Sequence, residues 1–235
     1  MVDHVYQLVL TTSSPHAELA IFKDDQDVFL ARNVLPRTHS DWIHVALQEG
    51  LAATGLSLNG FHSIALDMGP GSFTGVRVGA SLARALGFSL GLPIFAVSSL
   101  DILQSQFQSQ AQSQSQSQGP SCAMINAYKN KVYFSANRQP AEAIPLEKAA
   151  SFLHSFQGKL AGDAFQAYPE LASAAQKANL LLPRQEAEIY PSAKLLARLA
   201  AAAPERTLAD WTQVQPLYVR ESEPEEKRAR SLEKP

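Results

Sequence analysis

Cysteine is almost missing from this 235-residue chain, because Cys122 is the only one. A single thiol forms neither an internal disulfide framework nor a cysteine-based metal cluster. An excess of positive charge is missing too: 20 Lys and Arg face 22 Asp and Glu, which excludes nucleic-acid binding by bulk attraction. The sequence also lacks an apolar run that could span a membrane and a signal-like basic N-terminus. We therefore expect a soluble, cytoplasmic protein without membrane contact, whose 46% hydrophobic residues suffice for a core.

One glycine-rich stretch organises the chain. Residues 68–79 read MGPGSFTGVRVG, after a short apolar strand at 63–67 and before a helix predicted over 76–90. Glycine tolerates positive φ and close approach, so such a turn can point N–H groups outward at a helix N-terminus, where anions bind. The stretch therefore predicts candidate anion or nucleotide contacts at Gly71, Ser72 and Thr74.

The helix after this turn carries a ridge of small residues. Gly75, Gly79, Ala83 and Gly87 recur every four positions and so lie along one inclined row. Each helical glycine costs about 1 kcal/mol relative to alanine. A row without side chains indicates that another backbone comes close to it. That backbone belongs either to a helix of another subunit or to this protein's own sheet, and periodicity leaves both open.

The first half predicts a mixed sheet. Strands at 5–10, 19–22 and 28–31 are joined by tight turns and so form an antiparallel meander. A helix follows from His39 to about Ala53. The strand at 63–67, the helix after the glycine turn and a strand at 93–97 form a βαβ unit, whose two strands should be parallel.

A Gln- and Ser-rich tract divides the chain, because it has no hydrophobic periodicity and cannot bury a core. We expect an N-terminal lobe over 1–104, a linker over 105–119, a C-terminal lobe over 120–220 and a flexible charged tail over 221–235. Within the second lobe the patterns predict a hairpin at 122–136, helices at 146–156, 168–178 and 193–202, and strands at 159–163 and 180–182.

Motifs of catalysis are scarce. The glycine turn is not a P-loop, since no Lys-Ser/Thr follows it, and not a nucleophile elbow, since Phe73 occupies the central position. His39 and His44 are five residues apart on one helix and so point about 140° apart, too far to share a metal. An actin-like phosphotransferase would need an acid at the end of the first strand, where Thr11 stands. The residues favour binding over catalysis, with no catalytic set, no metal site and no cofactor.

The glycine turn resembles the signature of the bacterial TsaB (YeaZ) family. Segments in the same order support the resemblance: Thr38–Ser40, Pro93–Leu100, Asn126–Phe134 and Pro216–Arg220. The resemblance implies an α/β protein of the actin-like ATPase (ASKHA) fold, with two lobes that each contain a mixed sheet flanked by helices.

The same resemblance implies a non-catalytic subunit. It would pair with the transferase TsaD to place threonylcarbamoyl on the adenosine beside the anticodon of tRNA, with the ATPase TsaE in a ternary complex. The chain would form a homodimer when alone and reach tRNA only through the complex. Such proteins pair through their first two helices, which favours the intersubunit interpretation of the ridge. The implied interface residues are His39, Trp42, Ile43, Ala46, Gly75, Gly79, Ala83 and Gly87.

Two departures and two alternatives accompany the resemblance. The family usually carries Asp where Thr11 and Asn126 stand, so a metal–nucleotide site in this chain's own cleft is in doubt. The main alternative is an actin-like phosphotransferase or a peptidase-type enzyme with its own nucleotide or metal site. A dinucleotide-binding module is a further alternative, but the antiparallel start of the sheet disfavours it.

Overall fold

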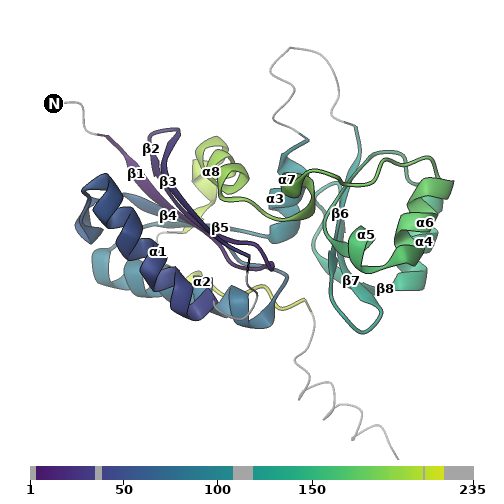
Figure 1. Ribbon diagram of the computed structural model, residues 1–235, viewed down its shortest axis with the longest axis horizontal. Coiled ribbons are helices and arrows are strands. Elements are labelled where there is room, and N and C mark those ends of the chain that lie inside the picture. The colour runs from purple at the N-terminus through teal and green to yellow at the C-terminus, as the bar shows by residue number, and fades with distance from the viewer. Residues whose placement is uncertain (1–3, 35–38, 108–118, 209, 220–235) are drawn as a thin grey trace, which may run out of the picture.

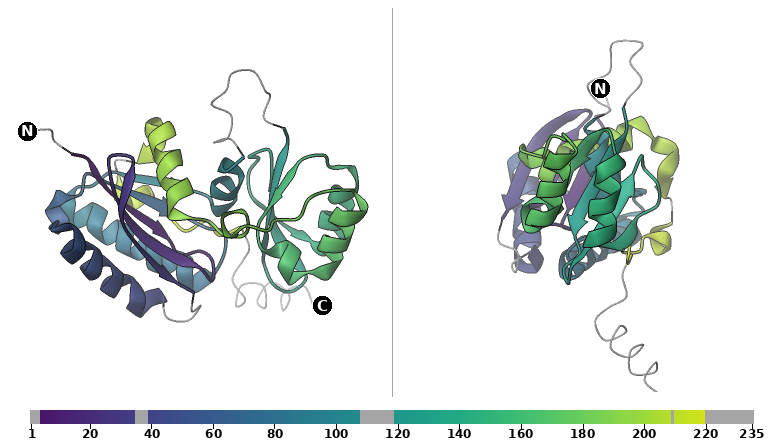
Figure 2. Two further views of the ribbon diagram at one scale, coloured as in Figure 1. Left: turned by 45° about the horizontal axis from the view of Figure 1, so that its top comes forward. Right: turned by 90° about the vertical axis from the view of Figure 1, so that its right-hand side faces the viewer.

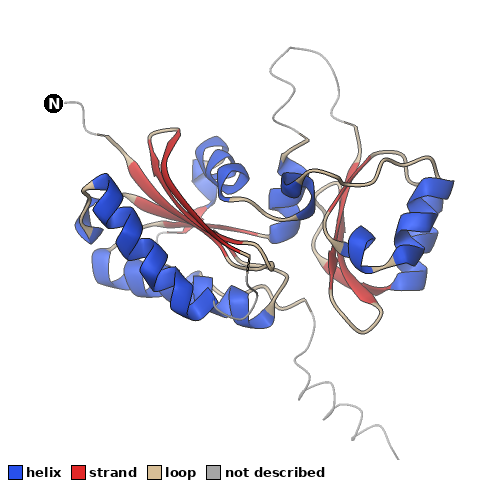
Figure 3. Cartoon of the chain, in the orientation of Figure 1, coloured by secondary structure: helices blue, strands red, loops and turns tan. Residues whose placement is uncertain are grey.

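The computed structural model describes residues 4–34, 39–107, 119–208 and 210–219, and it divides into two lobes (Figure 1). Each lobe contains one mixed sheet flanked by helices (Figure 3), so the expected α/β, two-lobed architecture is confirmed. Among these residues no helix is both long and apolar enough to cross a membrane.

The first lobe is built on a six-stranded sheet in the order β10-β5-β4-β1-β2-β3. The three N-terminal strands pair antiparallel, whereas β1, β4 and β5 run parallel, as the βαβ pattern predicts. The strands are β1 (Tyr6–Thr11), β2 (Ala17–Lys23), β3 (Gln26–Asn33), β4 (Ser63–Asp67), β5 (Ile94–Val97) and β10 (Thr207–Leu208).

Helices cover both faces of this sheet (Figures 1 and 2). α1 (His39–Thr54) and α2 (Phe73–Leu90) pack on the face that buries Leu8, Leu10 and Leu66. α8 (Ala193–Ala202) packs on the opposite face, over Val9 and Ala65. The alternation along β1 and β4 sends every second side chain to each core.

The second lobe has a four-stranded sheet in the order β8-β7-β6-β9. α4 and α6 cover one face, and α3 packs against the other through Leu100 and Leu103. The elements around this sheet are α3 (Ser99–Ser105), β6 (Ser121–Asn126), β7 (Lys131–Ala136), β8 (Glu142–Pro145), α4 (Leu146–Ser155), β9 (Lys159–Ala161), α5 (Ala164–Ala167), α6 (Pro169–Lys177) and α7 (Glu186–Ile189). Three single 3-10 turns belong to the first lobe: η1 (Leu58–Gly60), η2 (Pro204–Arg206) and η3 (Trp211–Gln213).

The expected C-terminal lobe over 120–220 is too long. α8 packs on the first sheet, β10 pairs antiparallel with β5 at its edge, and Val214 is fully buried in the core beneath α1 and α2. The chain therefore returns to the first lobe after α7, because the apolar face of α8 covers the sheet surface opposite α1 and α2. The strand expected at 180–182 is also wrong, since these residues adopt no regular structure.

Some expectations fall outside the described residues. Most of the 105–119 linker (108–118), the 221–235 tail, Thr38 and Arg220 belong to this group.

Candidate functional site

The glycine turn is anchored by a buried carboxylate at the end of β4. Asp67 is fully buried, and its oxygens accept hydrogen bonds from the hydroxyls of Ser13 and Ser99, both at 2.5 Å, and from the N–H of Gly69 at 2.9 Å. Burial raises the pKa of Asp67, while these three hydrogen bonds oppose the rise. The carboxyl group thus joins the turn after β1, the glycine turn and the start of α3. Sequence reasoning missed this role, although an acid that ends an apolar strand was a visible signal.

The glycine turn packs against backbone of its own chain. A Cβ on Gly71 would fall on the carbonyl oxygen of Ser13, and one on Gly75 would fall on that of Thr12. The N–H of Ser72 donates to the Ser13 carbonyl oxygen at 2.6 Å, and the Ser72 hydroxyl caps α2 by accepting from the N–H of Gly75 at 3.3 Å. The N–H and the hydroxyl of Ser72 thus have partners within the protein, and the anion contact expected at Gly71 and Ser72 stays a prediction. Thr74 lies exposed on the first turn of α2.

The small-residue ridge faces the protein's own interior. A Cβ on Gly79 would strike the Thr12 hydroxyl, and one on Gly87 would lie 2.8 Å from the Ile94 Cδ1 atom. Ala83 is fully buried in the core shared with the sheet. The expectation that Gly75, Gly79, Ala83 and Gly87 meet a partner's helix is therefore wrong, because this chain's own strands fill that space.

The residues expected on the first helix are mostly buried as well. Ile43 and Ala46 lie in the core beneath α1, whereas Trp42 is half-buried at its edge. The Nε2–H of His39 donates to the Ser14 carbonyl oxygen at 3.1 Å, and its Nδ1 accepts from the Asn33 amide at 3.3 Å. Burial lowers the pKa of His39, so the neutral ring ties the start of α1 to the turn after β1. His39, Ile43 and Ala46 are thus structural, and only Trp42 is accessible.

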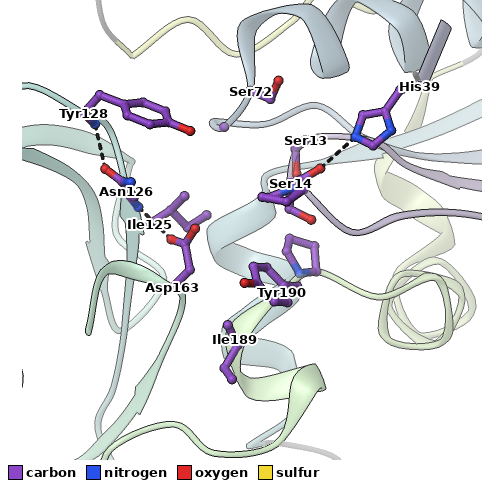
Figure 4. A pocket seen from close by; sticks show the side chains of 13 residues that line it. Ser13, Ser14, His39, Ser72, Ile125, Asn126, Tyr128, Asp163, Ile189 and Tyr190 are labelled. Atoms are coloured by element: carbon purple, nitrogen blue, oxygen red, sulfur yellow. Dashed lines mark hydrogen bonds between the residues drawn. The ribbon is translucent and has the colours of Figure 1, made fainter. Parts of the chain in front are cut away.

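A small cleft lies between the lobes (Figure 4). Its volume is about 60 Å³, enough for a few water molecules. Pockets for small-molecule ligands occupy about 300–1,000 Å³. Its lining comes from both lobes: Ser13, Ser14, Pro15, His39, Gly71, Ser72, Ile125, Asn126, Tyr128, Asp163, Ile189, Tyr190 and Pro191. The cleft is too small for the nucleotide that an actin-like ATPase fold implies.

The polar groups of the cleft do not suit a metal–nucleotide complex either. The side-chain oxygen of Asn126 accepts from the N–H of Tyr128 at 2.8 Å and from the hydroxyl of Tyr168 at 2.7 Å. Thr11, where an acid would hold a metal, is buried. In the described part of the chain no three His, Cys, Asp or Glu residues gather into a metal-binding group.

Among the residues that the structure describes, Asp163 is the one carboxylate that lines this cleft, and it allows a pH-dependent test. It accepts a hydrogen bond from the N–H of Asn126 at 2.7 Å, and burial raises its pKa above 3.8. Between pH 3.8 and the raised pKa, Asp163 keeps its proton in the folded state more than in the unfolded state. The free energy of unfolding therefore falls as the pH rises through this interval. Asp163→Asn keeps the acceptor and removes the charge. We expect it to stabilise the protein by about 1 kcal/mol at pH 8, a Tm increase of roughly 2–4 °C.

Thermal unfolding followed from pH 8 to pH 4 measures this effect. The Tm difference between Asp163→Asn and the wild type should shrink toward zero near pH 4. Asp25→Asn, which makes the same substitution on an exposed hairpin turn outside the cleft, is the control. A variant that melts at or below the wild-type temperature at pH 8 would refute the unfavourable burial of this carboxylate.

The accessible surface near the glycine turn is the outer face of α1 and α2, which lie together on one side of the first sheet (Figure 1). Apolar side chains are exposed on it: Val45 is 50% exposed and Phe88 is 69% exposed. The two helices carry opposite charges. The sequence of α1 has acids at Asp41 and Glu49 and no Lys or Arg, whereas that of α2 has Arg77 and Arg84 and no acid.

Comparison with known proteins assigns this architecture to a family. The family model described as TsaD, tRNA N6-adenosine threonylcarbamoyltransferase, matches residues 33–223. The tRNA threonylcarbamoyladenosine biosynthesis protein TsaB of Haemophilus influenzae is 36% identical over 129 residues, 54% of this chain and 52% of that protein. The chain belongs to the TsaD family, among its TsaB (YeaZ) proteins.

Further relatives agree with the TsaB assignment. TsaB of Escherichia coli is 34% identical over 93 residues, which cover 40% of each chain. YeaZ from Pseudomonas aeruginosa superposes with a TM-score of 0.71 at 25% identity over 91% of this chain and 99% of that one. The sequence matches span about half the length of the curated relatives or less. The structural match extends the TsaB-like fold over both lobes, which confirms the ASKHA architecture.

Proposed function

We propose that this TsaB-like chain is a non-catalytic subunit in the threonylcarbamoyl modification of tRNA, paired with a TsaD-like transferase through the outer face of α1 and α2. The observation that carries the proposal is the accessible face itself, where an acidic helix and a basic helix each expose apolar side chains. Because the family model of the transferase matches this chain, we infer that the partner shares its fold and presents two comparable helices. Two such faces can pack about a pseudo-twofold axis, with α1 of each subunit opposite α2 of the other.

The same reasoning extends to the other expected partners. Alone, the chain would pair with a second copy through this face. A TsaE-like ATPase would join the pair, tRNA would be bound only by the assembly, and the complex would act in the cytoplasm. An actin-like phosphotransferase is the second candidate, and the cleft of about 60 Å³ disfavours it. The purified chain should therefore show no ATP hydrolysis, and turnover that follows the chain through purification would revive that candidate.

Co-purification with the TsaD-like protein of the same organism tests the pairing. Val45→Arg puts a cation in the centre of the acidic helix, where it would face the arginines of a partner's basic helix. We expect the affinity for the TsaD-like protein to fall at least tenfold, or about 1.4 kcal/mol. Leu181→Arg is the matched control, since Leu181 is 84% exposed in the second lobe, and it should bind normally. Wild-type affinity in folded Val45→Arg would place the pairing surface elsewhere.

A further inference from the structure

The C-terminal segment over residues 210–219 runs along α2 in the opposite direction. At the end of α2, Trp211 stacks edge-to-face on Phe88 with ring centroids 5.2 Å apart. At the start of α2, the Tyr218 ring lies 5.5 Å from that of Phe73. The N–H of Leu217 also donates to the carbonyl oxygen of Met68 at 2.8 Å, beside the glycine turn. The segment therefore adds one aromatic ring to each end of the outer face of α2.

Each aromatic pair holds an arginine. The guanidinium carbon of Arg77 lies 3.7 Å from the ring centroid of Phe73, and its Nε–H donates to the Tyr218 hydroxyl at 2.9 Å. The guanidinium carbon of Arg84 lies 5.5 Å from the ring centroid of Trp211. We call these sets the front cluster (Phe73, Arg77, Tyr218) and the rear cluster (Arg84, Phe88, Trp211).

Both guanidinium groups keep donors available. Within the described ranges neither Arg77 nor Arg84 has a carboxylate at ion-pairing distance. A guanidinium has five N–H donors, and stacking on a ring holds its plane while its edge stays open to a bidentate carboxylate. Arginine and large aromatic residues are also the types that dominate the binding energy of protein interfaces. The clusters therefore have the residue types of interface anchors, and their guanidinium groups have N–H donors that a partner can use.

We propose that the front and rear clusters bind two carboxylates on one helix of the partner protein, so that Arg77 and Arg84 decide which partner is accepted. This inference rests on the proposed function and identifies the partner's chemistry. The arginines are seven residues apart, two helical turns or about 10.5 Å along the axis. A partner helix packed nearly along α2 would present its acids at the same spacing, seven or eight positions apart. The acids of α1, Asp41 and Glu49, are eight positions apart and show this arrangement within the fold.

Charge favours a protein over RNA as the occupant. α1, which contacts α2, carries Asp41 and Glu49 and no Lys or Arg, so it would repel a phosphate backbone. The chain as a whole also carries a net charge of −2. A helix with two acids and an apolar stripe meets both the arginines and the exposed rings of Phe73 and Phe88.

A double charge reversal, Arg77→Glu with Arg84→Glu, tests the inference in the full-length chain. Its affinity for the TsaD-like protein should fall about a hundredfold by isothermal titration calorimetry. Lys194→Glu with Arg198→Glu makes the same charge change on the exposed side of α8, across the sheet, and should change affinity less than twofold. Arg77→Lys with Arg84→Lys keeps the charge and loses the planar fork, so an intermediate loss of about tenfold is expected. The wild-type affinity should also weaken as salt increases, a readout that needs no variant.

The outcomes separate this inference from the function on which it rests. The carboxylate anchors are refuted if the folded double-reversal variant binds the TsaD-like protein with an affinity within threefold of the wild type. They are also refuted if the wild-type affinity does not change with salt concentration. Loss of binding in Val45→Arg would then still support pairing through the outer face. If the wild type binds no TsaD-like protein, the proposed function and this inference both fall. Binding of tRNA to the isolated chain that only the double reversal abolishes, with protein affinity unchanged, would assign the arginines to RNA instead.

Discussion

Gly75→Ala should lower the free energy of unfolding by about 3 kcal/mol, at the upper end for overpacked sites. In a chain of this size that corresponds to a Tm decrease of roughly 6–12 °C, measured by circular dichroism. The reason is that the added Cβ would fall on the carbonyl oxygen of Thr12, a backbone atom that cannot rotate away. On an open helix surface the same substitution would instead stabilise by about 1 kcal/mol. The sign of the effect therefore reports what lies against the ridge.

Ser81→Ala is the control for this experiment. Ser81 is exposed on the same helix, so its replacement should leave Tm nearly unchanged. A Gly75→Ala protein that melts higher than the wild type would show that the ridge is open to solvent. For the same reason, bulky substitutions at Gly79 or Ala83 test folding and not partner binding.

Asp67→Ala should also destabilise the fold by about 3 kcal/mol, because each buried polar group left without a partner costs about 1–3 kcal/mol. The substitution leaves the hydroxyls of Ser13 and Ser99 and the N–H of Gly69 without their shared acceptor. The two hydroxyls lie 3.0 Å apart and can partly compensate each other, so the three costs do not simply add. Urea denaturation at neutral pH measures the loss.

Asp25→Ala, in the exposed turn between β2 and β3, is the matched control for Asp67→Ala and should unfold like the wild type. Equal unfolding midpoints for Asp67→Ala and the wild type would mean that the carboxylate does not hold the glycine turn. The prediction concerns stability alone, since Asp67 is fully buried and reaches no outer surface.

Local sequence signals located most elements of the fold. The antiparallel start, the parallel β4 and β5, the hairpin of β6 and β7, and the span of α8 were all predictable, because periodicity and turn residues act over a few positions. Two short strands escaped prediction. β10 has two residues and β8 has four, too few for a pattern of alternation, and both form only because a neighbouring strand is available.

The candidate site was predicted less well than the fold. The first two helices were singled out, yet seven of the eight expected interface residues are buried, and Trp42 alone is partly accessible. The residues that carry the proposals lie on the same helix one or two positions from the ridge: Arg77 and Phe88 are exposed, and Arg84 is half-buried. Tyr218 and Trp211 contact this helix from the C-terminal part of the chain, and no residue spacing within α2 predicts those contacts.

By itself the sequence determined that α2 begins after a glycine turn and has one row without side chains, because helix period and glycine geometry are local properties. Only the tertiary structure decided what fills that row. The Thr12 backbone comes from a strand end more than sixty positions earlier and occupies the space that a partner's helix would need. Which face of a helix meets solvent depends on how sheet and helix pack, and that packing places the arginines of α2 outward.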